Sequence, residues 1–369
     1  MLRFCSSHIK YYGGKGELLQ NYDYISKKTV VDNFDSFVNP ATKIRNIGYT
    51  SGTTGTPGKF LRDFRSMAAE QFLQNRYFGW RGKYMVVLRG ERLFDVGYTS
   101  DIIYKIVPFI KEMYISTFHL TDKTFERLVI KLAAIKNKCL WAYPSAAYLL
   151  AEYCLRNNVR LDFDIVATSS ESLYDFQIKA IEKAFGKKIK DWYGQAERVA
   201  AFYRCENGKY HEVEGYSHVE YIPSYDNLHE IAGTSLHNKV MPLVRYRLDD
   251  LMELSGEPCG CGNSGPVLNR IHGRKSSYVL LPNGKLSETN MAIMFKPTRN
   301  IREAQVIQHR DLKITVKVVR EAVYGEEDEK MLFKSIYSTL PEDLCKVVYV
   351  DRIQRDSRGK FRFLINESE

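Results

Sequence analysis

Hydrophobic residues recur at helical spacing along much of the chain. Residues 122–138 carry apolar side chains three or four positions apart, at Phe125, Leu128, Leu132 and Ile135, which is the pattern of an amphipathic helix. Three further helices are predicted over residues 65–77, over 144–158, which opens on Pro144, and over 172–186, which ends on Gly186.

Short apolar runs lie between these segments and predict buried strands. They span residues 84–88, 139–143, 162–170 and 187–194. Alternation of strands and helices indicates a mostly parallel sheet covered by helices. After about residue 205 the pattern changes to shorter strands separated by turn residues, which is typical of antiparallel pairing. These strands are predicted over residues 218–224, 228–238 and 241–248.

A loop rich in glycine, cysteine and proline at 255–266 precedes a change in the pattern near residue 274. Beyond it, strands are predicted over 302–308, 312–319 and 345–353, and a helix over 327–340. The expected fold is α/β, with a large N-terminal domain at 1–273 that has mostly parallel sheets covered by helices and a smaller antiparallel sheet. A small α+β C-terminal lid domain follows at 274–369.

Composition narrows the function classes. The 369 residues are 44% hydrophobic and 27% charged, the balance of a folded globular protein. No apolar run reaches the roughly 18 residues of a membrane span, and the N-terminus lacks the features of a signal peptide, so we expect a cytoplasmic protein without a membrane partner. The net charge is +10, but basic residues are interleaved with acidic ones. We therefore expect no nucleic-acid partner, whereas a polyanion such as ATP suits a basic cleft.

The most informative segment is YTSGTTGTPGKF at 49–60. Its glycines, hydroxyl side chains and lysine are groups that hold phosphate oxygens. A Walker A loop is excluded, because five residues separate Gly52 from Gly58 and Phe60 stands where a magnesium-binding hydroxyl is required.

Residues 49–59 closely resemble the signature loop of the adenylate-forming superfamily, which includes acyl-CoA synthetases and nonribosomal-peptide adenylation domains. The resemblance implies that the loop surrounds the β- and γ-phosphates of ATP, with Thr53 also acting in catalysis. Lys59 follows Gly58 here, whereas many members have lysine and then glycine. The loop residues implied to bind the nucleotide are Ser51, Gly52, Thr53, Thr54, Gly55 and Lys59.

A second motif follows in the family's order. WYGQAERVA at 192–200 resembles an aromatic–glycine–x–threonine–glutamate motif. The resemblance implies that Tyr193 stacks on adenine beside Gly194, and that the Glu197 carboxylate holds the Mg²⁺ that bridges the phosphates. Ala196 replaces the threonine that usually contacts the α-phosphate.

Four further segments complete the resemblance. SSES at 169–172 matches the adenine side of the pocket, with Ser170 and Glu171 as candidates. Asp250 in RYRLDDL matches the carboxylate that binds the ribose hydroxyls, as two acceptor oxygens suit a vicinal diol. Arg274 matches the hinge arginine that contacts ribose or phosphate. Lys360 matches the mobile lysine that neutralises charge between the acid and the α-phosphate.

The implied reaction is attack of a small-molecule carboxylic acid on the α-phosphorus of ATP, with release of pyrophosphate. The acceptor of the acyl group stays open between coenzyme A, a carrier-protein thiol and an amine. YGQAERVA, CENGKYH and CGCGNSGPVLNRIHGR make the chain look most like the phenylacetate–coenzyme A ligase branch, especially its members associated with capsular-polysaccharide biosynthesis. The alternative is a non-catalytic or degenerate nucleotide-binding protein of the same fold.

The same segments carry a metal hypothesis. The odd number of cysteines, seven, favours thiols or metal ligation over a disulfide framework. Cys205, His211, Cys259 and Cys261 supply three thiols and one imidazole, the donor set of a closed, structural Zn²⁺ site. Residues 218, 229, 237 and 272 are histidines for which the sequence offers no partner, and we expect them to be structural or exposed.

The acyl substrate is not defined by the sequence. Aromatic residues between 84 and 143, including Phe94, Tyr98, Trp141 and Tyr143, suit either an aryl acid or ordinary core packing. Only 48 residues precede the phosphate loop, fewer than relatives carry. We therefore expect a more open acyl pocket, or one completed by a partner or a second subunit of a homo-oligomer.

Overall fold

The computed structural model describes residues 1–43, 46–49, 58–89, 93–95, 98–224, 227–274, 278–284, 286–288, 298, 300–353 and 364–367. By its internal contacts the chain divides into two compact units. The first contains Met1–Ile222, Glu230–Leu248 and Met252–His272, and the second contains Pro223–His229, Asp249–Leu251 and Gly273–Glu369.

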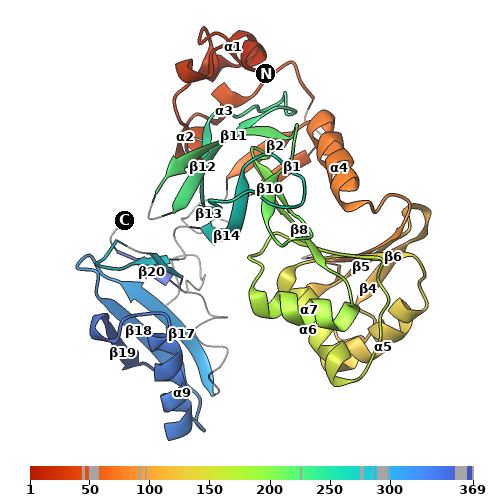
Figure 1. Cartoon of the computed structure of the whole chain (residues 1–369), viewed down its shortest axis with the longest axis vertical. Coiled ribbons are helices and arrows are strands. Elements are labelled where there is room, and N and C mark those ends of the chain that lie inside the picture. Colours follow the sequence, from red (N-terminus) through yellow and green to blue (C-terminus); the bar gives the residue numbers. More distant parts are fainter. Residues whose placement is uncertain are drawn as a thin grey trace. The chain divides into compact units, whose positions relative to one another are not determined.

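The helices of the described residues are α1 (Leu2–His8), α2 (Lys27–Asp32), α3 (Phe34–Phe37), α4 (Phe64–Phe78), α5 (Asp122–Ala133), α6 (Pro144–Arg156), α7 (Asp175–Phe185) and α9 (Glu326–Tyr337) (Figure 1). The first strands are β1 (Asn46–Tyr49), β2 (Lys59–Arg62), β3 (Tyr84–Leu88), β4 (Tyr104–Val107), β5 (Glu112–Ile115), β6 (Lys138–Ala142), β7 (Ile165–Ser169), β8 (Ile189–Gly194), β9 (Ala201–Arg204) and β10 (Tyr210–Glu212). The later strands are β11 (Ser217–Pro223), β12 (Leu228–Ser235), β13 (Tyr246–Leu254), β14 (Val267–Arg274), β15 (Tyr278–Leu280), β16 (Leu286–Glu288), β17 (Ile301–Gln308), β18 (Ile314–Arg320), β19 (Cys345–Tyr349) and β20 (Leu364–Asn366).

One large sheet organises most of these strands. Its order is β11-β12-β13-β14-β10-β9-β8-β7-β6-β3-β5-β4 within the described part of the chain. The strands β8, β7, β6, β3 and β5 run parallel, while β4, β9 and β10 pair antiparallel with their neighbours. This arrangement confirms the expected α/β class with a parallel part and an antiparallel part.

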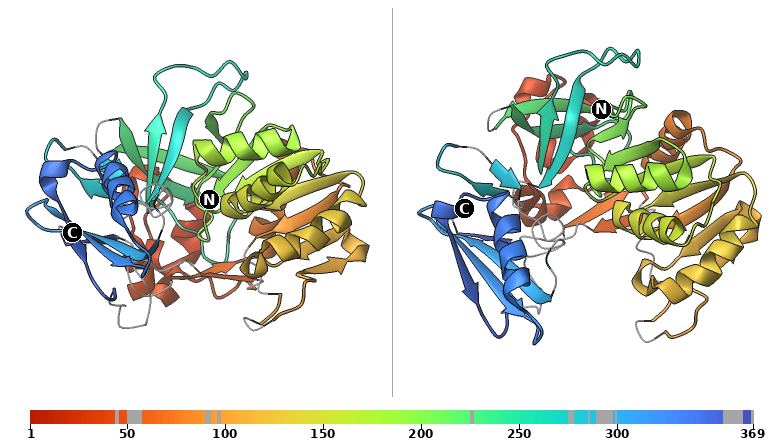
Figure 2. Two further views of the ribbon diagram at one scale, coloured as in Figure 1. Left: turned by 90° about the horizontal axis from the view of Figure 1, so that it is seen from below. Right: turned by 60° about the horizontal axis from the view of Figure 1, so that its bottom comes forward.

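Helices cover both faces of the parallel strands. The helices α5, α6 and α7 share one core with Leu88, Leu140 and Val166, and Figure 2 shows them side by side. On the opposite face, Leu73 of α4 packs in a second core that contains Trp192 and other buried aromatic side chains. Because side chains alternate along a strand, the central strands β3 and β6 are buried on both faces, which explains their mostly apolar sequences.

The N-terminal helices pack in a third core with the antiparallel half of the sheet. The Tyr12 hydroxyl accepts a hydrogen bond from the backbone N–H of Val244 at 3.0 Å. The backbone N–H of Ile25 donates to the Arg245 carbonyl oxygen at 3.1 Å. These contacts dock the first residues of the chain onto the turn that precedes β13.

The second unit has its own sheet and core. Its strands follow the order β19-β18-β17-β20, with β17 and β18 antiparallel. Leu332 and Ile336 of α9 pack with Val316 and Val318 of β18. This is an α+β arrangement, as expected for the C-terminal residues.

Most predicted elements lie within a few residues of the observed ones, and two predictions were wrong in extent. Residues 241–245 were expected in a strand, but β13 begins at Tyr246. The backbone N–H groups of Val244 and Arg245 donate to the Tyr12 and Thr234 hydroxyls, and Arg245 has a φ of 52°, so the ladder cannot extend there. The helix expected to reach residue 138 ends at Ala133, because the chain turns into β6 at Lys138.

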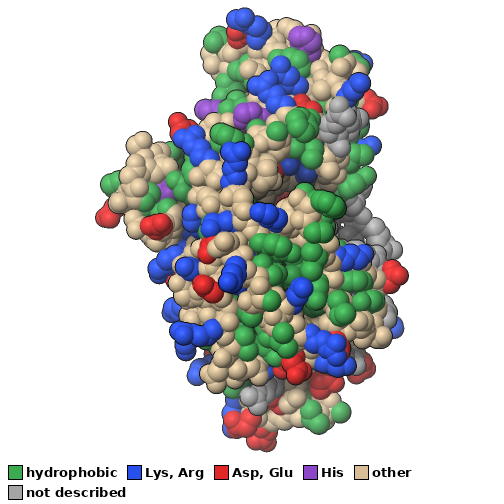
Figure 3. Space-filling model, turned by 90° about the vertical axis from the view of Figure 1, so that its right-hand side faces the viewer, with side chains coloured by type: hydrophobic (Ala, Val, Ile, Leu, Met, Phe, Trp, Pro, Cys, Tyr) green, Lys and Arg blue, Asp and Glu red, His purple; other side chains and the backbone are tan. Residues whose placement is uncertain are grey.

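The strand β4 forms an edge of the large sheet and carries exposed apolar side chains. Phe109, just beyond it, is 98% exposed, and Ile106 and Ile110 are also exposed. Figure 3 shows hydrophobic side chains gathered on this side of the molecule. Among the described residues, no helix combines the length and apolarity needed to cross a membrane.

Candidate functional site

The phosphate-loop segment is anchored by a short antiparallel pair. Tyr49 at the end of β1 lies opposite Lys59 at the start of β2. The residues between them, including the expected contacts Ser51, Gly52, Thr53, Thr54 and Gly55, lie outside the described residues. The Lys59 ammonium lies 5.4 Å from the ring centroid of Phe34. The strand pair therefore brings the two ends of the glycine-rich segment together.

The tyrosine–glutamate motif leaves the carboxyl end of β8. Tyr193 and Gly194 end this strand, and Tyr193 packs against Phe202 with ring centroids 5.7 Å apart. Glu197 is buried, and its Oε1 accepts a hydrogen bond from the Tyr246 hydroxyl at 3.0 Å. A buried carboxylate held in this way has a fixed direction, which suits a cation ligand.

Two arginines fix the same loop, Arg62 from β2 and Arg198 from within the loop by pairing with Glu70 of α4. Arg62 of β2 donates through Nε and Nη2 to the Ala196 carbonyl oxygen at 3.0 and 2.8 Å. Burial and the neighbouring Arg198 lower the pKa of the Arg62 guanidinium. Arg198 has a φ of 56°, and its Nη2 forms an ion pair with Glu70 Oε2 at 2.5 Å. The backbone of the motif is therefore fixed by charged groups that the sequence reasoning missed.

The adenine-side segment follows β7. Ser170 has a left-handed backbone with a φ of 71°, and its Oγ accepts a hydrogen bond from Arg89 Nη2 at 2.8 Å. The Glu171 carboxylate accepts a hydrogen bond from the backbone N–H of Ser145 at 3.0 Å, at the start of α6. The Arg89 guanidinium lies 4.5 Å from the ring centroid of Trp141. Sequence reasoning missed Arg89, although a charged residue directly after a buried strand is a usable signal.

The remaining predicted nucleotide contacts are not brought together by the described contacts. Asp250 is half-buried on β13 and falls in the second compact unit. Arg274 ends β14 and also falls in that unit. Lys360 lies outside the described residues. The site as described is thus the carboxyl edge of the parallel strands with the loop 193–198.

Asp191 of β8 is a buried carboxyl group with two hydroxyl partners. Its oxygens accept hydrogen bonds from Thr168 Oγ1 at 2.5 Å and from the Tyr210 hydroxyl at 2.8 Å. Burial raises the pKa of Asp191 to about 6, although these two hydrogen bonds oppose the shift. The carboxyl group of β8 is therefore hydrogen-bonded to a side chain of β7 and to a side chain of β10.

The cysteine–histidine group forms one cluster. The ligand atoms of Cys205, His211, Cys259 and Cys261 all lie within 4.8 Å of one another. Cys205 Sγ lies 3.7 Å from Cys259 Sγ, and Cys261 Sγ lies 3.3 Å from His211 Nε2. Tetrahedral coordination with Zn–S bonds of about 2.3 Å separates two sulfur atoms by roughly 3.8 Å. The donor set and the spacing therefore fit a structural zinc ion.

Three of the histidines expected to lack a local partner have one. His272 Nε2 lies 2.9 Å from Glu253 Oε2, His237 Nε2 lies 2.6 Å from the Gly215 carbonyl oxygen, and His229 Nδ1 lies 3.1 Å from the Asn227 carbonyl oxygen. The partners of His272 and His237 lie 19 and 22 residues away in the sequence, whereas the partner of His229 lies two residues before it.

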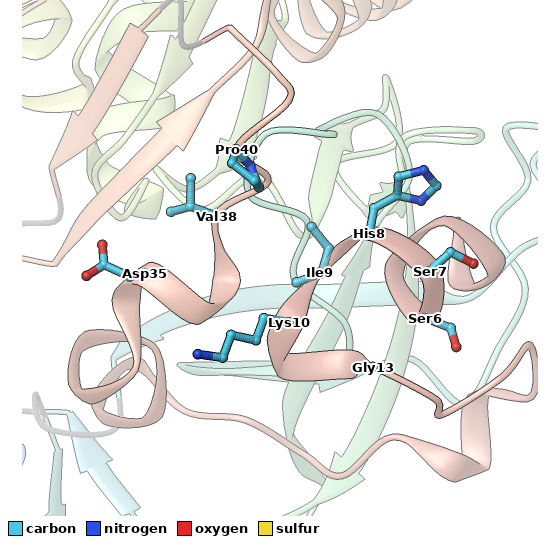
Figure 4. Close-up of a pocket in the computed structure, with 9 residues that line it drawn as sticks. All are labelled: Ser6, Ser7, His8, Ile9, Lys10, Gly13, Asp35, Val38 and Pro40. Atoms are coloured by element: carbon cyan, nitrogen blue, oxygen red, sulfur yellow. The ribbon is translucent and has the colours of Figure 1, made fainter.

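A pocket of about 560 Å³ lies among the N-terminal helices (Figure 4). It is lined by residues from the first 40 positions of the chain, so it contains no residue of the motif loop. It is open, and its polar lining residues are mostly exposed. None of them was predicted to be functional. The lining residues are Ser6, Ser7, His8, Ile9, Lys10, Gly13, Asp35, Val38 and Pro40.

Comparison with solved structures decides the fold. A 2-hydroxyisobutyryl-CoA ligase in the postadenylation state, in complex with 2-HIB-AMP, aligns with a TM-score of 0.64 at 16% identity, over 99% of this chain and 87% of that one. ATP-bound MatB from Rhodopseudomonas palustris aligns with a TM-score of 0.51 at 15% identity, over 88% of this chain and 67% of that one. The chain has the fold of the adenylate-forming ligases.

Sequence comparison shows a similarity to CapK proteins. Residues 281–367 match the CapK C-terminal domain family. Protein CapK of Staphylococcus aureus is 22% identical, with 93% of this chain and 79% of that protein aligned. The chain is thus similar to CapK in sequence and to adenylate-forming ligases in fold, whereas the phenylacetate–coenzyme A ligase branch stays a prediction.

Proposed function

We propose that the protein uses ATP to convert a carboxylic acid into an acyl-adenylate, releases pyrophosphate, and transfers the acyl group to a thiol or an amine. The observation that carries this proposal is the tyrosine–glutamate loop at the carboxyl end of β8. It occupies the edge of a parallel sheet where open α/β proteins bind ligands. Its motif follows the glycine-rich segment in the order of the adenylate-forming superfamily.

The chemistry requires no protein nucleophile. A carboxylate oxygen of the acid attacks the α-phosphorus, the bond from that phosphorus to the bridging oxygen of the β-phosphate breaks, and pyrophosphate leaves with the electron pair. In the second step a thiolate or amine attacks the acyl carbon and AMP leaves. Alignment and charge stabilisation supply the catalysis.

The chain's own residues divide this work. The hydroxyls and backbone N–H groups of the glycine-rich segment hold the β- and γ-phosphates, and Tyr193 packs on adenine. The Glu197 carboxylate, oriented by Tyr246, is the ligand for Mg²⁺, which neutralises phosphate charge when bound. Asp250 binds the ribose diol. Residues 274–369 act as a lid that carries Lys360 to the reacting carboxylate.

Arg62 fixes the backbone at position 196, where this chain has alanine in place of the usual threonine. Alanine lacks the hydroxyl that most relatives use at the α-phosphate. In this chain the Ala196 carbonyl oxygen accepts two hydrogen bonds from the Arg62 guanidinium. The loop is thereby fixed by its backbone, and the positive charge of Arg62 lies beside the motif.

The cysteine–histidine cluster supports a second, structural proposal. Cys205 and His211 flank the β9–β10 turn, while Cys259 and Cys261 come from the loop after β13. With four protein ligands, a Zn²⁺ ion has no open position for catalysis. We propose that it fastens the 255–266 loop to the sheet.

The test is ATP–pyrophosphate exchange with radiolabelled pyrophosphate, over a panel of aryl, fatty, hydroxy and dicarboxylic acids. We expect exchange that depends on one class of acid and falls at least about a hundredfold in Lys360→Ala, as is typical when charge stabilisation in the transition state is removed. Lys346→Ala, a substitution in β19, is the control. Binding of magnesium–ATP without exchange for any acid would instead favour the non-catalytic alternative.

A further inference from the structure

A row of side chains crosses the carboxyl edge of the parallel strands on one face. In the sheet register, Leu88 pairs with Ala142, and Ala142 pairs with Thr168. The residues one position further along these strands are Arg89, Tyr143 and Ser169, and Ser169 pairs with Trp192. Trp192 packs in the core that α4 covers, and Arg89 stacks over Trp141 of the same core.

Side-chain hydrogen-bond donors lie at the two ends of this row. At one end, Arg89 stacks over Trp141 and donates to Ser170 Oγ. At the other end, the Trp192 indole N–H is buried and finds no acceptor among the described residues, although the side chain is only 3% exposed.

The helix α4 and the motif loop close the far end of this row. Glu70 Oε2 pairs with Arg198 Nη2, and Glu70 Oε1 accepts a hydrogen bond from the Tyr216 hydroxyl at 3.3 Å. A Cβ atom built on Gly194 would lie 3.1 Å from Trp192 Nε1 and 3.9 Å from Glu70 Oε1. The indole N–H therefore lies against Gly194, beside the charged pair.

One N–H group of the Arg198 guanidinium has no acceptor within the described residues. Its Nη1 atom is buried and has no hydrogen-bond partner within the described part of the chain, as is also true of Gln195 Nε2. Leaving a buried donor unpaired costs about 1–3 kcal/mol, so such groups call for a partner that arrives later. Arg62 and Arg198 share this cluster with the carboxylates of Glu70 and Glu197.

Under the proposed function Arg198 lies in the loop that binds ATP, and Trp192 directly precedes that loop on β8. We propose that the acid activated by the enzyme carries a second oxygen acceptor, a carboxylate or a hydroxyl, on its acyl chain, and that Arg198 Nη1 and Trp192 Nε1 bind this group. The inference rests on the proposed function and narrows its substrate class. The aromatic and apolar surroundings exclude water, which strengthens both hydrogen bonds.

The experiment uses acids matched in carbon skeleton. ATP–pyrophosphate exchange is measured with butyrate, 3-hydroxybutyrate and succinate, and with benzoate, 4-hydroxybenzoate and terephthalate. We expect kcat/KM for an oxygenated acid to exceed that of its unsubstituted counterpart at least about tenfold, as expected when a site built to hydrogen-bond is left unpaired. Whether the hydroxy acid or the dicarboxylate is preferred identifies the acceptor.

Two variants connect the preference to the named donors. Trp192→Phe should raise the KM of the preferred acid about five- to tenfold, since it removes one hydrogen bond, with the KM of ATP unchanged. Trp80→Phe is the matched control, because Trp80 Nε1 is also buried and unpartnered within the described residues but Trp80 lies before β3, outside the row. Arg198→Lys keeps the charge but loses the planar fork, and should weaken the same acid at least about tenfold.

The outcomes separate the two proposals. Equal use of butyrate and succinate, and of benzoate and its oxygenated partners, would overturn this inference while leaving acid activation intact. Equal effects of Trp192→Phe and Trp80→Phe would also overturn it. Absence of exchange with every acid would overturn the proposed function itself, and the inference with it.

Discussion

Two buried carboxyl groups near the end of β8 face different surroundings. Glu197 accepts a hydrogen bond from Tyr246 and belongs to the motif loop. Asp191 lies deeper, and its only hydrogen bonds from side chains within the described residues come from Thr168 and Tyr210. Both carboxyl groups are buried, Glu197 in the motif loop and Asp191 within the sheet.

The raised pKa of Asp191 predicts how the free energy of unfolding changes with pH. It rises from 3.8 to about 6 on burial, so between about pH 4 and pH 6 the folded state holds more protons than the unfolded state. This group therefore favours the folded state below that window, and its contribution is lost as pH rises through it. Across the whole titration, the change in protonation of Asp191 should lower the free energy of unfolding by about 3 kcal/mol as the pH rises.

The measurement is urea unfolding at several pH values for wild type and Asp191→Asn. The variant should lack this decline, because an amide does not titrate. Asp162→Asn, which replaces an exposed aspartate, should retain the wild-type profile. Parallel profiles for wild type and Asp191→Asn would contradict the assignment.

At the scale of single elements, α4 matters because it follows the phosphate loop and carries Glu70. Asp63 caps this helix: its Oδ1 accepts a hydrogen bond from the Ser66 N–H at 2.8 Å. Its Oδ2 accepts one from the backbone N–H of Lys239, also at 2.8 Å. One buried carboxylate thus fixes the start of α4 and ties it to the turn before β13.

Asp63→Ala should lower the free energy of unfolding by about 3 kcal/mol, the sum of a lost cap and a buried backbone donor left unpaired. Thr121→Ala removes only the cap of α5 and should cost about 1 kcal/mol. Urea denaturation measures both. Similar losses in the two variants would show that the Lys239 contact contributes nothing.

The metal cluster also belongs to the scale of elements, since it joins a strand turn to a loop. Purified protein should contain one zinc ion per chain by elemental analysis. Cys205→Ser should lose it, because a hydroxyl is a poor zinc ligand, and protease cleavage within 255–266 should then become faster. The control variant Cys154→Ser, which changes a buried residue of α6 outside the cluster, should keep the zinc ion. Zinc-free wild-type protein with an equally resistant loop would refute the proposal.

The sequence predicted elements and motifs better than it predicted the groups around them. Helix α6 and strand β7 follow from their own periodicity and from Pro144. Glu70 could not be predicted as a site residue, because a glutamate on a helix is ordinarily solvated. Its burial results from packing of α4 on the sheet, which joins residues distant in sequence.

At the scale of the whole molecule, the predicted class was correct but the single large sheet was not foreseen. Within its antiparallel half, Tyr210 of β10 pairs with Leu268 of β14, and the spacing of apolar residues does not predict such a long-range pair. The same limit applied to the cysteine cluster. Its four members were chosen from residue type and resemblance, and the strand pairing then brings two segments of the chain together.

The fold and the order of the motifs lead to one chemical claim, that the acid attacks the α-phosphorus of ATP. The most direct test uses the acid that supports exchange, labelled with ¹⁸O in its carboxylate, in a complete turnover with an acceptor thiol or amine. Cleavage of an acyl-adenylate at the acyl carbon predicts one ¹⁸O atom in the AMP, detected by mass spectrometry. Label in inorganic phosphate with ADP as the other product would show attack at the γ-phosphorus, and would contradict the account.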